Sequence, residues 1–597
     1  MTTTEIPKFT MHYFKSKVIE LKSLEAAYER SSDDVTNNYN PFQLKNLQNY
    51  NPIYGQFFSL NSSNFNSISF NQKYQILDMM NIINQETREP SEKSVFIKYS
   101  PLIDPLRYMI GKYKTATESI LMLPSIDYAD IKTNSHPKLV DVNNASYVDN
   151  FFSFLSSKIL HTHKFSNGLD YYGSFLGIQD KFKVNIIDDL DYLNESDYFK
   201  DNFNKLFTIS RTEGDDEFMN FGSRTNKQKL VISGTPKHNI TMEEILLIQE
   251  EKVEEPGDSN NCSDVVYEKN TSKSSSSAST NSSNNSEANY SSDGDEEDDN
   301  NDDNSTKNSD SDGHGDGDSD SDSDSDNDDN SDNGSSESSS SEEPAIFAYI
   351  NKFPVQLICL EKCDGTIDEL FEKDKMTSDE AASALFQIIM VLITYQHCFY
   401  FTHNDLHTNN IMYVNTDIEY LFYKYKNTVY RVPTYGKIYK LIDFGRSIYR
   451  FQGKLFCSDS FATGGDAATQ YNCEPYMNEN KPRLEPNFSF DLCRLGSSIY
   501  DFIIDEDDDE RDFDELQNTI ARWCTDDNGK NVLYKKNGDE RYPGFKLYKM
   551  IARGVHHHTP QEQLDFPYFS QFTLTNKKAK KIDMDLVFDI DTLPTYV

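Results

Sequence analysis

Apolar residues follow two different periods along this chain, and each period predicts one type of element. Short runs rich in β-branched and aromatic residues are typical of strands. Four such runs lie at residues 93–99, 169–178, 353–360 and 438–442. We therefore expect short strands that are widely separated in the sequence.

Longer stretches place apolar residues three and four positions apart, which predicts amphipathic helices. Residues 145–160 have this pattern, and so does the stretch that follows Thr377. Thr377 and Glu380 have the T-x-x-E spacing of a capping box, which marks the start of a helix. Shorter helical patterns lie at 366–371 and 490–504. Strands and helices together predict an α+β fold.

Two long segments lack a clear period. Residues 1–90 are rich in Asn, Tyr, Phe and Ser, and we treat them as an N-terminal extension of unknown role. Residues 179–344 are interpreted as an insertion, which from about residue 271 consists of Ser, Asp and Asn in runs such as SDSDSDSD. Such a composition buries too little apolar surface to offset the entropy of ordering, so we predict that this part is disordered.

The charge of the chain is strongly negative. The net charge is -40, and residues 281–343 hold 23 Asp and Glu against one Lys, so the rest of the chain still carries -18. An acidic surface repels the phosphates of nucleic acids, so we expect no DNA or RNA partner. The acidic tract could instead attract a basic protein partner.

Cysteine usage and apolar runs bear on the compartment. The eight cysteines include no C-x-x-C pair, and several fall inside apolar runs, which favours free thiols in a reducing compartment. The first residues lack the basic and then apolar pattern of a signal peptide. The longest apolar-rich run, 385–395, contains Gln387 and is too short to span a bilayer. We expect a soluble intracellular protein without a membrane segment.

The strongest chemical signal is the stretch FTHNDLHTNNIMYV at 401–414. His403, Asp405, Leu406 and Asn410 fit the pattern H-x-D-L-x-x-x-N. Phosphoryl transfer needs a carboxylate that orients the attacking hydroxyl and accepts its proton, and Asp405 is our candidate for this general base. It also needs an oxygen that binds Mg²⁺ near the phosphates, and Asn410 is the candidate ligand.

The second signal is KLIDFGRS at 440–447. Asp443 begins a D-F-G triplet directly after a predicted strand, and its carboxylate would bind the Mg²⁺ that bridges the ATP phosphates. A D-F-G triplet alone is a weak signal, because an ordinary turn at a strand end can contain it. The two motifs in this order, each behind the expected element, are hard to obtain by chance.

Through these motifs the chain resembles the eukaryotic-type protein kinase superfamily. The resemblance is nearly continuous from residue 353 to about residue 572. The stretch CLEKCDGTIDEL at 359–370 is similar to the kinase hinge, which implies that the backbone of Glu361 and Cys363 binds adenine. The stretches around Asp491 (FDLCRLG) and at 559–569 are similar to helices of the kinase large lobe. The composition and the acidic insertion are similar to Ser/Thr protein kinases of giant amoeba-infecting DNA viruses, which implies host cytoplasm or virion as the location.

The resemblance is less complete in the small lobe. Residues 95–98, Val-Phe-Ile-Lys, resemble the V-A-I-K strand, which implies that Lys98 contacts the α- and β-phosphates of ATP. The family places a Glu on the next helix as the partner of this lysine, and Asp149 is the candidate here. No G-x-G precedes Lys98, so the glycine-rich loop that would cover the phosphates is not visible.

Three departures from the kinase pattern change the expected mechanism. Asn404 stands where many regulated kinases have Arg, so a phosphorylated activation loop would lack a cationic partner there, and we expect activity that is independent of loop phosphorylation. His407 stands where Ser/Thr kinases have Lys, and it would stabilise the charge of the γ-phosphate less well. The stretch 415–437 is longer than usual and predicts an extended hairpin on the surface.

The resemblance implies a bilobal protein-kinase-like fold of the α+β class, with a long disordered acidic insertion in the small lobe. The small lobe would comprise residues 91–178 and a strand at 345–360 that enters the hinge. The large lobe would comprise 361–575, followed by a C-terminal tail at 576–597.

The implied function is ATP-dependent transfer of the γ-phosphate to Ser/Thr hydroxyls of a protein substrate, with ATP and Mg²⁺ as cofactors. Three alternatives stay open. The H-x-D-L-H form of the loop favours a small-molecule phosphotransferase, and the missing glycine loop favours a pseudokinase. The acidic insertion favours a scaffold that binds basic proteins.

Two groups of histidines were considered as metal ligands, at 556–558 and at His161 and His163. Neither group has a Cys or carboxylate at a spacing that would complete a metal site. We therefore expect loop or core histidines.

Overall fold

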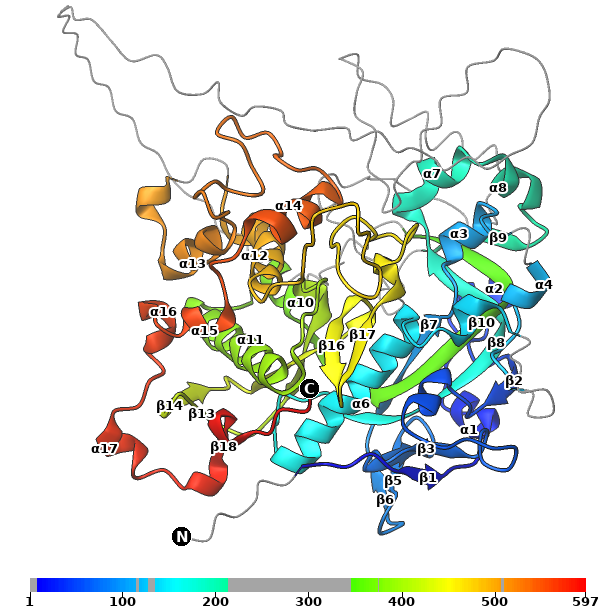
Figure 1. Ribbon diagram of the computed structural model, residues 1–597, viewed down its shortest axis with the longest axis horizontal. Helices are drawn as coiled ribbons and strands as arrows, with labels where there is room; N and C mark the ends of the chain where they lie inside the picture. The colour runs from blue at the N-terminus through cyan, green and yellow to red at the C-terminus, as the bar shows by residue number, and fades with distance from the viewer. Residues whose placement is uncertain (1–7, 114–116, 127–134, 213–344, 374, 506–508) are drawn as a thin grey trace, which may run out of the picture. The chain divides into compact units, whose positions relative to one another are not determined.

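The computed structural model describes residues 8–113, 117–126, 135–212, 345–373, 375–505 and 509–597. These residues form a mixed α and β structure with several small sheets (Figure 1). The expected mixture of helices and strands is therefore confirmed. The predicted acidic, disordered segment from about residue 271 lies outside the described residues.

The largest sheet has five antiparallel strands. Its order is β2 (Leu44–Gln48), β8 (Tyr171–Asn185), β10 (Ala345–Glu361) and β7 (Val95–Pro101), and β9 (Phe207–Thr212) also pairs with β10. The predicted strands at 93–99, 169–178 and 353–360 correspond to β7, β8 and β10. Strands from distant parts of the sequence therefore pair directly, and Lys98 of β7 lies opposite Ile358 of β10.

The segment 179–212, which we assigned to the insertion, belongs to this sheet and its connections. β8 continues to Asn185 because Phe182 and Val184 prolong its buried positions, and η3 (Ile187–Asp189), α7 (Leu190–Asn194) and α8 (Asp197–Asn202) lead to β9. Thr212 of β9 pairs with Ala345 of β10, so residues 213–344 join two strands that are already paired. The ordered strand therefore extends past the predicted boundary at residue 178.

Gly173 marks a close approach within β8. Its φ of +115° is rarely adopted by residues with a side chain, and a Cβ there would lie 2.7 Å from Gln75 Nε2. Gln75 belongs to β4 (Tyr74–Ile76), which forms a small sheet with β5 (Asn81–Asn84) and β6 (Pro90–Glu92). The chain that precedes Lys98 therefore packs directly on β8.

Helix α6 (Ala145–His163) confirms the helix predicted for 145–160. It begins where the Asn144 side chain accepts the Ser146 N–H at 3.1 Å. Tyr147 belongs to the core of the main sheet, whereas Phe151 and Phe152 belong to the larger core of the helical part. Figure 1 shows α6 running between β10 and the hairpin of β16 (Ile448–Phe451) and β17 (Lys454–Cys457). Because α6 packs on both sides, its side chains are held firmly.

Helix α11 (Ser378–Phe399) begins with the predicted capping box, in which Thr377 Oγ1 accepts the Glu380 N–H and the Glu380 carboxylate accepts the Thr377 N–H. It is longer than the apolar run 385–395, and by length and composition alone it could cross a membrane. Its most apolar window is 94% buried inside the protein, as in a core helix. Gln387 interrupts this run because its amide contacts the backbone of β15 (Lys437–Leu441) at Tyr439 N–H and the Lys437 carbonyl.

The remaining elements are short. Near the N-terminus they are α1 (Leu21–Glu25), α2 (Ser32–Thr36), η1 (Pro52–Gln56), α3 (Pro105–Met109), α4 (Thr117–Ile120) and α5 (Pro137–Val140). In the C-terminal half they are β11 (Gly365–Thr366), α10 (Ile367–Glu372), β12 (Ile411–Asn415), α12 (Phe490–Ile503), α13 (Glu515–Trp523), α14 (Lys546–Gly554), α15 (Pro560–Gln563), α16 (Pro567–Ser570) and α17 (Asn576–Ala579). The predicted helices at 366–371 and 490–504 correspond to α10 and α12.

The hairpin predicted for 415–437 is present as β13 (Tyr420–Tyr425) and β14 (Thr428–Pro433). Its expected surface position is only partly correct, because Tyr423 and Val432 are buried. β13 also pairs in parallel with β18 (Val587–Asp589) from the C-terminal segment. One face of the hairpin therefore belongs to the core.

Both ends of the described chain contribute to the larger core. Phe9 is buried there, and so is Phe70 of β3 (Ile68–Phe70), which pairs with β1 (Tyr13–Lys15). Tyr596 stacks on Phe9 with ring centres 4.1 Å apart. The parts that sequence analysis treated as an extension and a tail thus meet each other.

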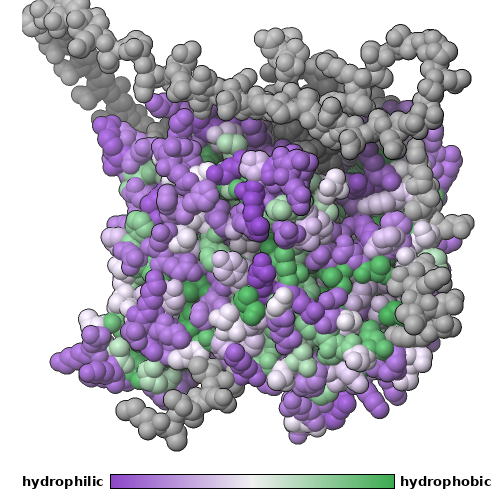
Figure 2. Space-filling view, viewed as in Figure 1, coloured by the Kyte–Doolittle hydropathy of each residue, from purple (hydrophilic) through white to green (hydrophobic). Residues whose placement is uncertain are grey.

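The surface and the thiols agree with a packed protein. On the face drawn in Figure 2, hydrophilic residues predominate and hydrophobic residues reach the surface between them. All seven described cysteines are free, and six of them are buried.

We predict that Tyr596→Ala lowers the free energy of unfolding by about 3 kcal/mol, because it removes a buried aromatic ring. The ring contacts Phe9 and Phe399, and the Tyr596 N–H donates to the Cys398 carbonyl at 2.9 Å. Urea unfolding measures the effect. Val597→Ala is the matched control, because Val597 is exposed. Equal stabilities of the two variants would show that the end of the chain does not pack as described.

Candidate active site

The loop with the H-x-D-L-x-x-x-N pattern connects α11 to β12, and its backbone is hydrogen bonded to α12. The carboxylate of Asp491 accepts the N–H groups of His403 at 2.9 Å and Asn404 at 2.8 Å. His403 Nε2 lies 2.9 Å from the carbonyl of Ile442, the residue before Asp443. One buried aspartate and one histidine therefore fix this loop against α12 and against the D-F-G turn.

Three predicted site residues meet around one ammonium group. Lys98 Nζ lies 2.7 Å from Asp149 Oδ2 and 2.8 Å from Asp443 Oδ1. The second oxygen of Asp149 accepts the Phe444 N–H at 2.9 Å. β7, α6 and the turn after β15 supply these groups, so the expected pairing of Lys98 with Asp149 is present.

The side chains of this cluster differ in exposure. Only 3% of the Asp149 side chain and 13% of the Lys98 side chain are exposed, whereas 39% of the Asp443 side chain is exposed. Asp443 has φ +60° and ψ +70°, a left-handed conformation that Asp tolerates better than most residues. This turn presents a carboxylate outward while Lys98 and Asp149 stay inside.

Burial and charge act in opposite directions on these groups. Burial alone would lower the pKa of Lys98, but Asp149 and Asp443 raise it above its usual value, so Lys98 stays charged. Burial alone would raise the pKa of Asp443, and Lys98 more than compensates, so this pKa is lowered. The pKa of Asp149 is raised by burial, which Lys98 only partly offsets.

Asp405 is also ionised at neutral pH. Burial would raise the pKa of Asp405, but the nearby charges of Arg446 and Arg494 and the hydrogen bond from Tyr548 hold it well below its usual range. Asp405 lies close enough to Asp443 to raise its pKa. The carboxylates of Asp405 and Asp443, predicted from separate motifs, are therefore close enough to interact electrostatically.

Asn410 presents an oxygen to the same neighbourhood. Its Nδ2 donates to the Asp405 carbonyl at 2.8 Å and lies 3.1 Å from His407 Nε2. Burial lowers the pKa of His407 to about 4, so the imidazole is neutral at neutral pH and its Nε2 can accept this bond. Since the amide nitrogen is engaged, Asn410 Oδ1 is left as the acceptor of this side chain.

The donor chemistry fits a Mg²⁺ ion bound together with a nucleotide. Asn410 Oδ1 and Asp443 Oδ2 receive no hydrogen bond from the residues that the structure describes. Oxygen ligands suit Mg²⁺, which usually takes one or two protein ligands and completes its shell with phosphates and water. Within the described ranges, no group of three or more His, Cys, Asp or Glu residues is arranged to hold a metal ion.

Asn404 has a structural role that sequence analysis did not predict. Its φ of +64° lies in the left-handed region, which Asn adopts more readily than most residues. Its amide group donates to the Arg446 carbonyl at 3.0 Å and accepts from the Tyr471 hydroxyl at 2.8 Å. Asn404 therefore joins both ends of the segment 446–471 to the loop.

The two hinge candidates differ in what they can offer. The Glu361 N–H already donates to the Asp170 carbonyl at 3.0 Å, so any adenine contact from Glu361 is left to its carbonyl. The Glu361 side chain is buried and accepts from Lys440 Nζ at 2.6 Å. For the Cys363 N–H no acceptor is found among the described residues. Burial raises the pKa of the Cys363 thiol to about 12, so the thiol keeps its proton at neutral pH.

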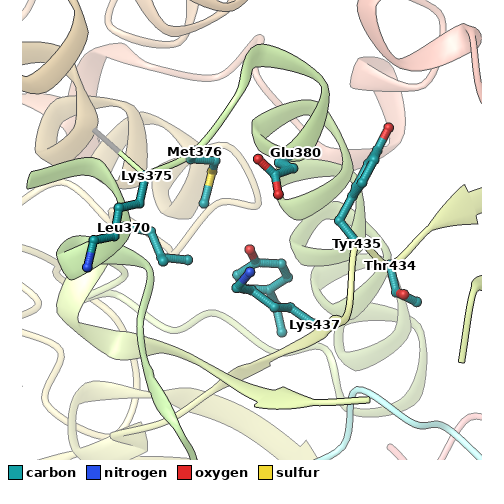
Figure 3. A pocket seen from close by; sticks show the side chains of 8 residues that line it. Leu370, Lys375, Met376, Glu380, Thr434, Tyr435 and Lys437 are labelled. Atoms are coloured by element: carbon teal, nitrogen blue, oxygen red, sulfur yellow. The ribbon is translucent and has the colours of Figure 1, made fainter. Parts of the chain in front are cut away.

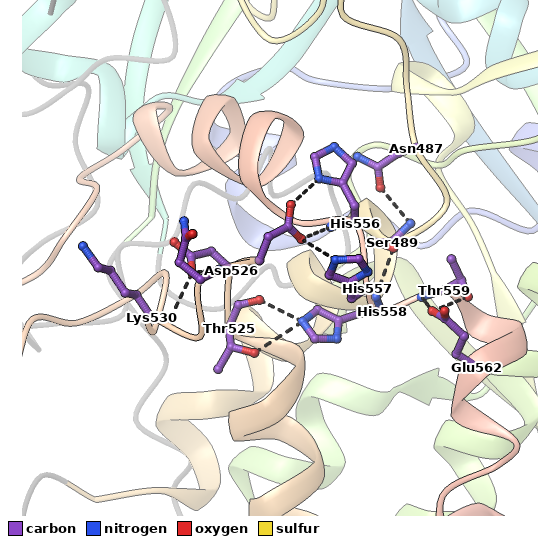
Figure 4. Close-up of polar contacts among 12 residues, drawn as sticks. Asn487, Ser489, Thr525, Asp526, Lys530, His556, His557, His558, Thr559 and Glu562 are labelled. Atoms are coloured by element: carbon purple, nitrogen blue, oxygen red, sulfur yellow. Dashed lines mark hydrogen bonds and ion pairs between the residues drawn. The ribbon is translucent and has the colours of Figure 1, made fainter. Parts of the chain in front are cut away.

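The histidines that we rejected as metal ligands contact protein groups. His556 Nδ1 lies 2.6 Å from Asp527 Oδ2, and His557 Nε2 lies 3.8 Å from Asp527 Oδ1. Figure 4 shows His558 beside Thr525, and His558 Nε2 lies 2.8 Å from the Thr525 carbonyl. His161 Nε2 lies 2.8 Å from Asp170 Oδ1. These contacts fit loop and core histidines.

A shallow pocket lies apart from these residues. Figure 3 shows it between α10, the start of α11 and the turn before β15, with Leu370, Met376 and Glu380 among its lining residues. It has room for about one water molecule, which is far too small for a nucleotide. It contains none of the candidate site residues.

Three residues around Asp405 were missed in the sequence. Tyr548 OH donates to Asp405 Oδ1 at 2.7 Å, and Arg446 Nη1 lies 3.7 Å from the same oxygen. Arg494 Nε donates to the Tyr548 hydroxyl at 2.8 Å. Arg446 directly follows D-F-G and Arg494 lies three residues after Asp491, so both could have been found near motifs. Tyr548 has no such neighbouring signal.

No known protein-family model matches this chain, and a search among curated proteins gives no significant match. The function is therefore argued from the geometry of the site.

We predict that Lys98→Met lowers the free energy of unfolding by about 3 kcal/mol, because Asp149 is left buried without its cation. In Lys98→Met/Asp149→Asn the loss should be smaller than the sum of the two single losses, by about 1–3 kcal/mol. Urea unfolding of the four proteins measures this coupling. Additive effects would contradict a direct ion pair.

Proposed function

We propose that this chain is an ATP-dependent protein kinase that transfers the γ-phosphate to Ser/Thr hydroxyls. The observation that carries the proposal is the position of Lys98 Nζ, 2.7 Å from Asp149 and 2.8 Å from Asp443. Lys98 and Asp443 were each chosen from a sequence motif for a role at the phosphates of ATP, and Asp149 was chosen as the acidic partner of Lys98 on the next helix. Their meeting is what phosphoryl transfer by a kinase requires.

The proposal includes a bilobal arrangement. The main sheet with α6 would be the small lobe, and the helices α11 to α16 would be the large lobe. The end of β10, with Glu361, and the residues that follow it, with Cys363, would be the hinge. Residues 213–344, between the paired strands β9 and β10, would be an insertion of the small lobe.

The roles of the site residues follow from their charges and from the side-chain oxygens that receive no hydrogen bond from the described residues. Asp405 is ionised, and its Oδ2 receives no hydrogen bond from the described residues, so it can orient a hydroxyl and accept its proton. Lys98, which stays charged, would position the phosphates. Asn410 Oδ1 and Asp443 would hold Mg²⁺.

A Mg²⁺ ion held by Asn410 and Asp443 would supply positive charge at the phosphates of ATP. The neutral His407 cannot supply a positive charge, whereas Arg446 lies near Asp405 and carries one. Most of the catalysis would come from positioning and from such fixed charges.

We predict that Asp405→Ala reduces phosphate transfer at least about 100-fold, because it removes the general base. Binding of ATP with Mg²⁺ should stay close to that of the parent protein, whereas Asp443→Ala should abolish the Mg²⁺-dependent part of ATP binding. Transfer from labelled ATP and thermal shift with ATP and Mg²⁺ measure the two effects. Asp417→Ala is the matched control, since Asp417 is exposed on the loop before β13.

Substrates in this assay should include protein extracts and small-molecule alcohols in parallel. Transfer to protein is the expected result. Transfer only to small alcohols would overturn the substrate class, and nucleotide binding without any transfer would indicate a pseudokinase. Parental activity in Asp405→Ala would show that Asp405 is not the base.

A further inference from the structure

The contacts of the Asp405 carboxylate are strongly unequal. The Tyr548 hydroxyl donates to Oδ1 at 2.7 Å, and Arg446 Nη1 lies 3.7 Å from that same oxygen. No hydrogen-bond donor within the described residues contacts Oδ2. The side chain is 22% exposed, so the carboxylate is partly accessible while its Oδ1 is anchored.

Tyr548 is itself held in place. It comes from α14, 143 positions away from Asp405, and it is buried. Arg494 Nε donates to its hydroxyl at 2.8 Å, and the Arg494 guanidinium lies 5.1 Å from the centre of its ring. The guanidinium of Arg446 lies 5.7 Å from the same ring centre. Burial raises the pKa of Tyr548, so the phenol keeps its proton and remains a donor to Asp405.

Helix α12 supports the loop in two ways through this arrangement. Asp491 accepts the N–H groups of His403 and Asn404, which fixes the backbone of the loop. Arg494 follows Asp491 by three positions, a spacing that places both on one face of a helix. Arg494 hydrogen bonds to Tyr548, which hydrogen bonds to the Asp405 side chain. One face of α12 therefore supports both the backbone of the loop and the side chain of the candidate base.

We propose that Tyr548 is a positioning residue for the general base, and that it holds Asp405 Oδ1 so that Oδ2 faces the substrate hydroxyl. This inference rests on the proposed kinase function. The last torsion of an Asp side chain is broad, so an unanchored carboxylate can rotate away from the orientation that points Oδ2 at the hydroxyl. His407 lies on the same loop as Asp405, but it hydrogen bonds to Asn410. The residue that holds Asp405 Oδ1 is therefore Tyr548 of α14.

The test removes only the hydroxyl of the tyrosine. Tyr548→Phe keeps the ring between its neighbours and deletes both hydrogen bonds of the hydroxyl, the one to Asp405 and the one from Arg494 Nε. Tyr534→Phe is the matched control, because the Tyr534 hydroxyl makes a bond of the same kind, at 2.6 Å to Asp501 Oδ1, outside the loop. For both variants we would measure kcat, the KM for ATP, and Tm.

The expected result is a fall of kcat by about 10- to 100-fold in Tyr548→Phe, with an unchanged KM for ATP, because a misdirected base slows the chemical step and not nucleotide binding. Tyr534→Phe should keep the parental kcat, and the fall in Tm should be larger in Tyr548→Phe, because the buried Arg494 Nε loses its acceptor there. An unchanged kcat in Tyr548→Phe would overturn the proposal. A raised kcat would overturn it as well, because the phenol would then be a block and not a support. An equal loss of kcat in both variants would indicate general loosening and also overturn it.

The outcome can be separated from that of the proposed function. If the parent protein transfers no phosphate, both proposals fall. If the parent is active and Tyr548→Phe has the parental kcat, only the role of Tyr548 is lost. Unfolding of Tyr548→Phe, Asp405→Ala and the double variant tests the contact without turnover, and additive losses would overturn it.

Discussion

The burial of one positive charge between two negative charges is the constraint on which the candidate site depends. Taking a charge out of water is costly, so Lys98 is tolerated inside only because Asp149 and Asp443 lie within hydrogen-bond distance. The converse also holds for Asp149, which is almost fully buried. The three side chains therefore keep β7, α6 and the turn after β15 in one relative position.

Neighbouring elements hold β7, α6 and the turn after β15 in this relative position. β7 is fixed by its register against β10, and α6 is fixed because hydrophobic cores lie on both of its sides. The turn after β15 is held by the bond from the Phe444 N–H to Asp149 and by His403, which contacts the Ile442 carbonyl. The Asp405 loop is joined to this assembly by α12. The result is a site whose polar groups are oriented before any ligand binds, which is what electrostatic catalysis requires.

Sequence patterns predicted the elements whose side chains repeat regularly over many residues. The helix at 145–160 and the strands at 93–99 and 353–360 were found in this way, and Asp149 was proposed as the partner of Lys98 because it lies on the next predicted helix. Residues 8–90 could not be predicted, because β1 and β3 have only three residues each and so show no period. Their stability comes from packing on distant segments.

Tertiary contacts that carry no local signal account for the other differences. Tyr548 lies in a helix without a motif and acts on a residue 143 positions away. Gln387 looked like a break in an apolar run, yet it hydrogen bonds to the backbone of β15. The hairpin of β13 and β14 was expected on the surface because this stretch is longer than usual, but the C-terminal segment packs against it. In each case the partner lies far away in the sequence.

The central claim is that Lys98 faces the phosphates of a bound nucleotide, and affinity labelling tests it most directly. An acyl-phosphate derivative of ATP transfers its acyl group to a lysine amine that lies beside the phosphates, and mass spectrometry of the digested protein locates the label. The account predicts that Lys98 is the main labelled lysine and that excess ATP with Mg²⁺ suppresses its labelling. Labelling elsewhere, or labelling of Lys98 that ATP does not suppress, would contradict it.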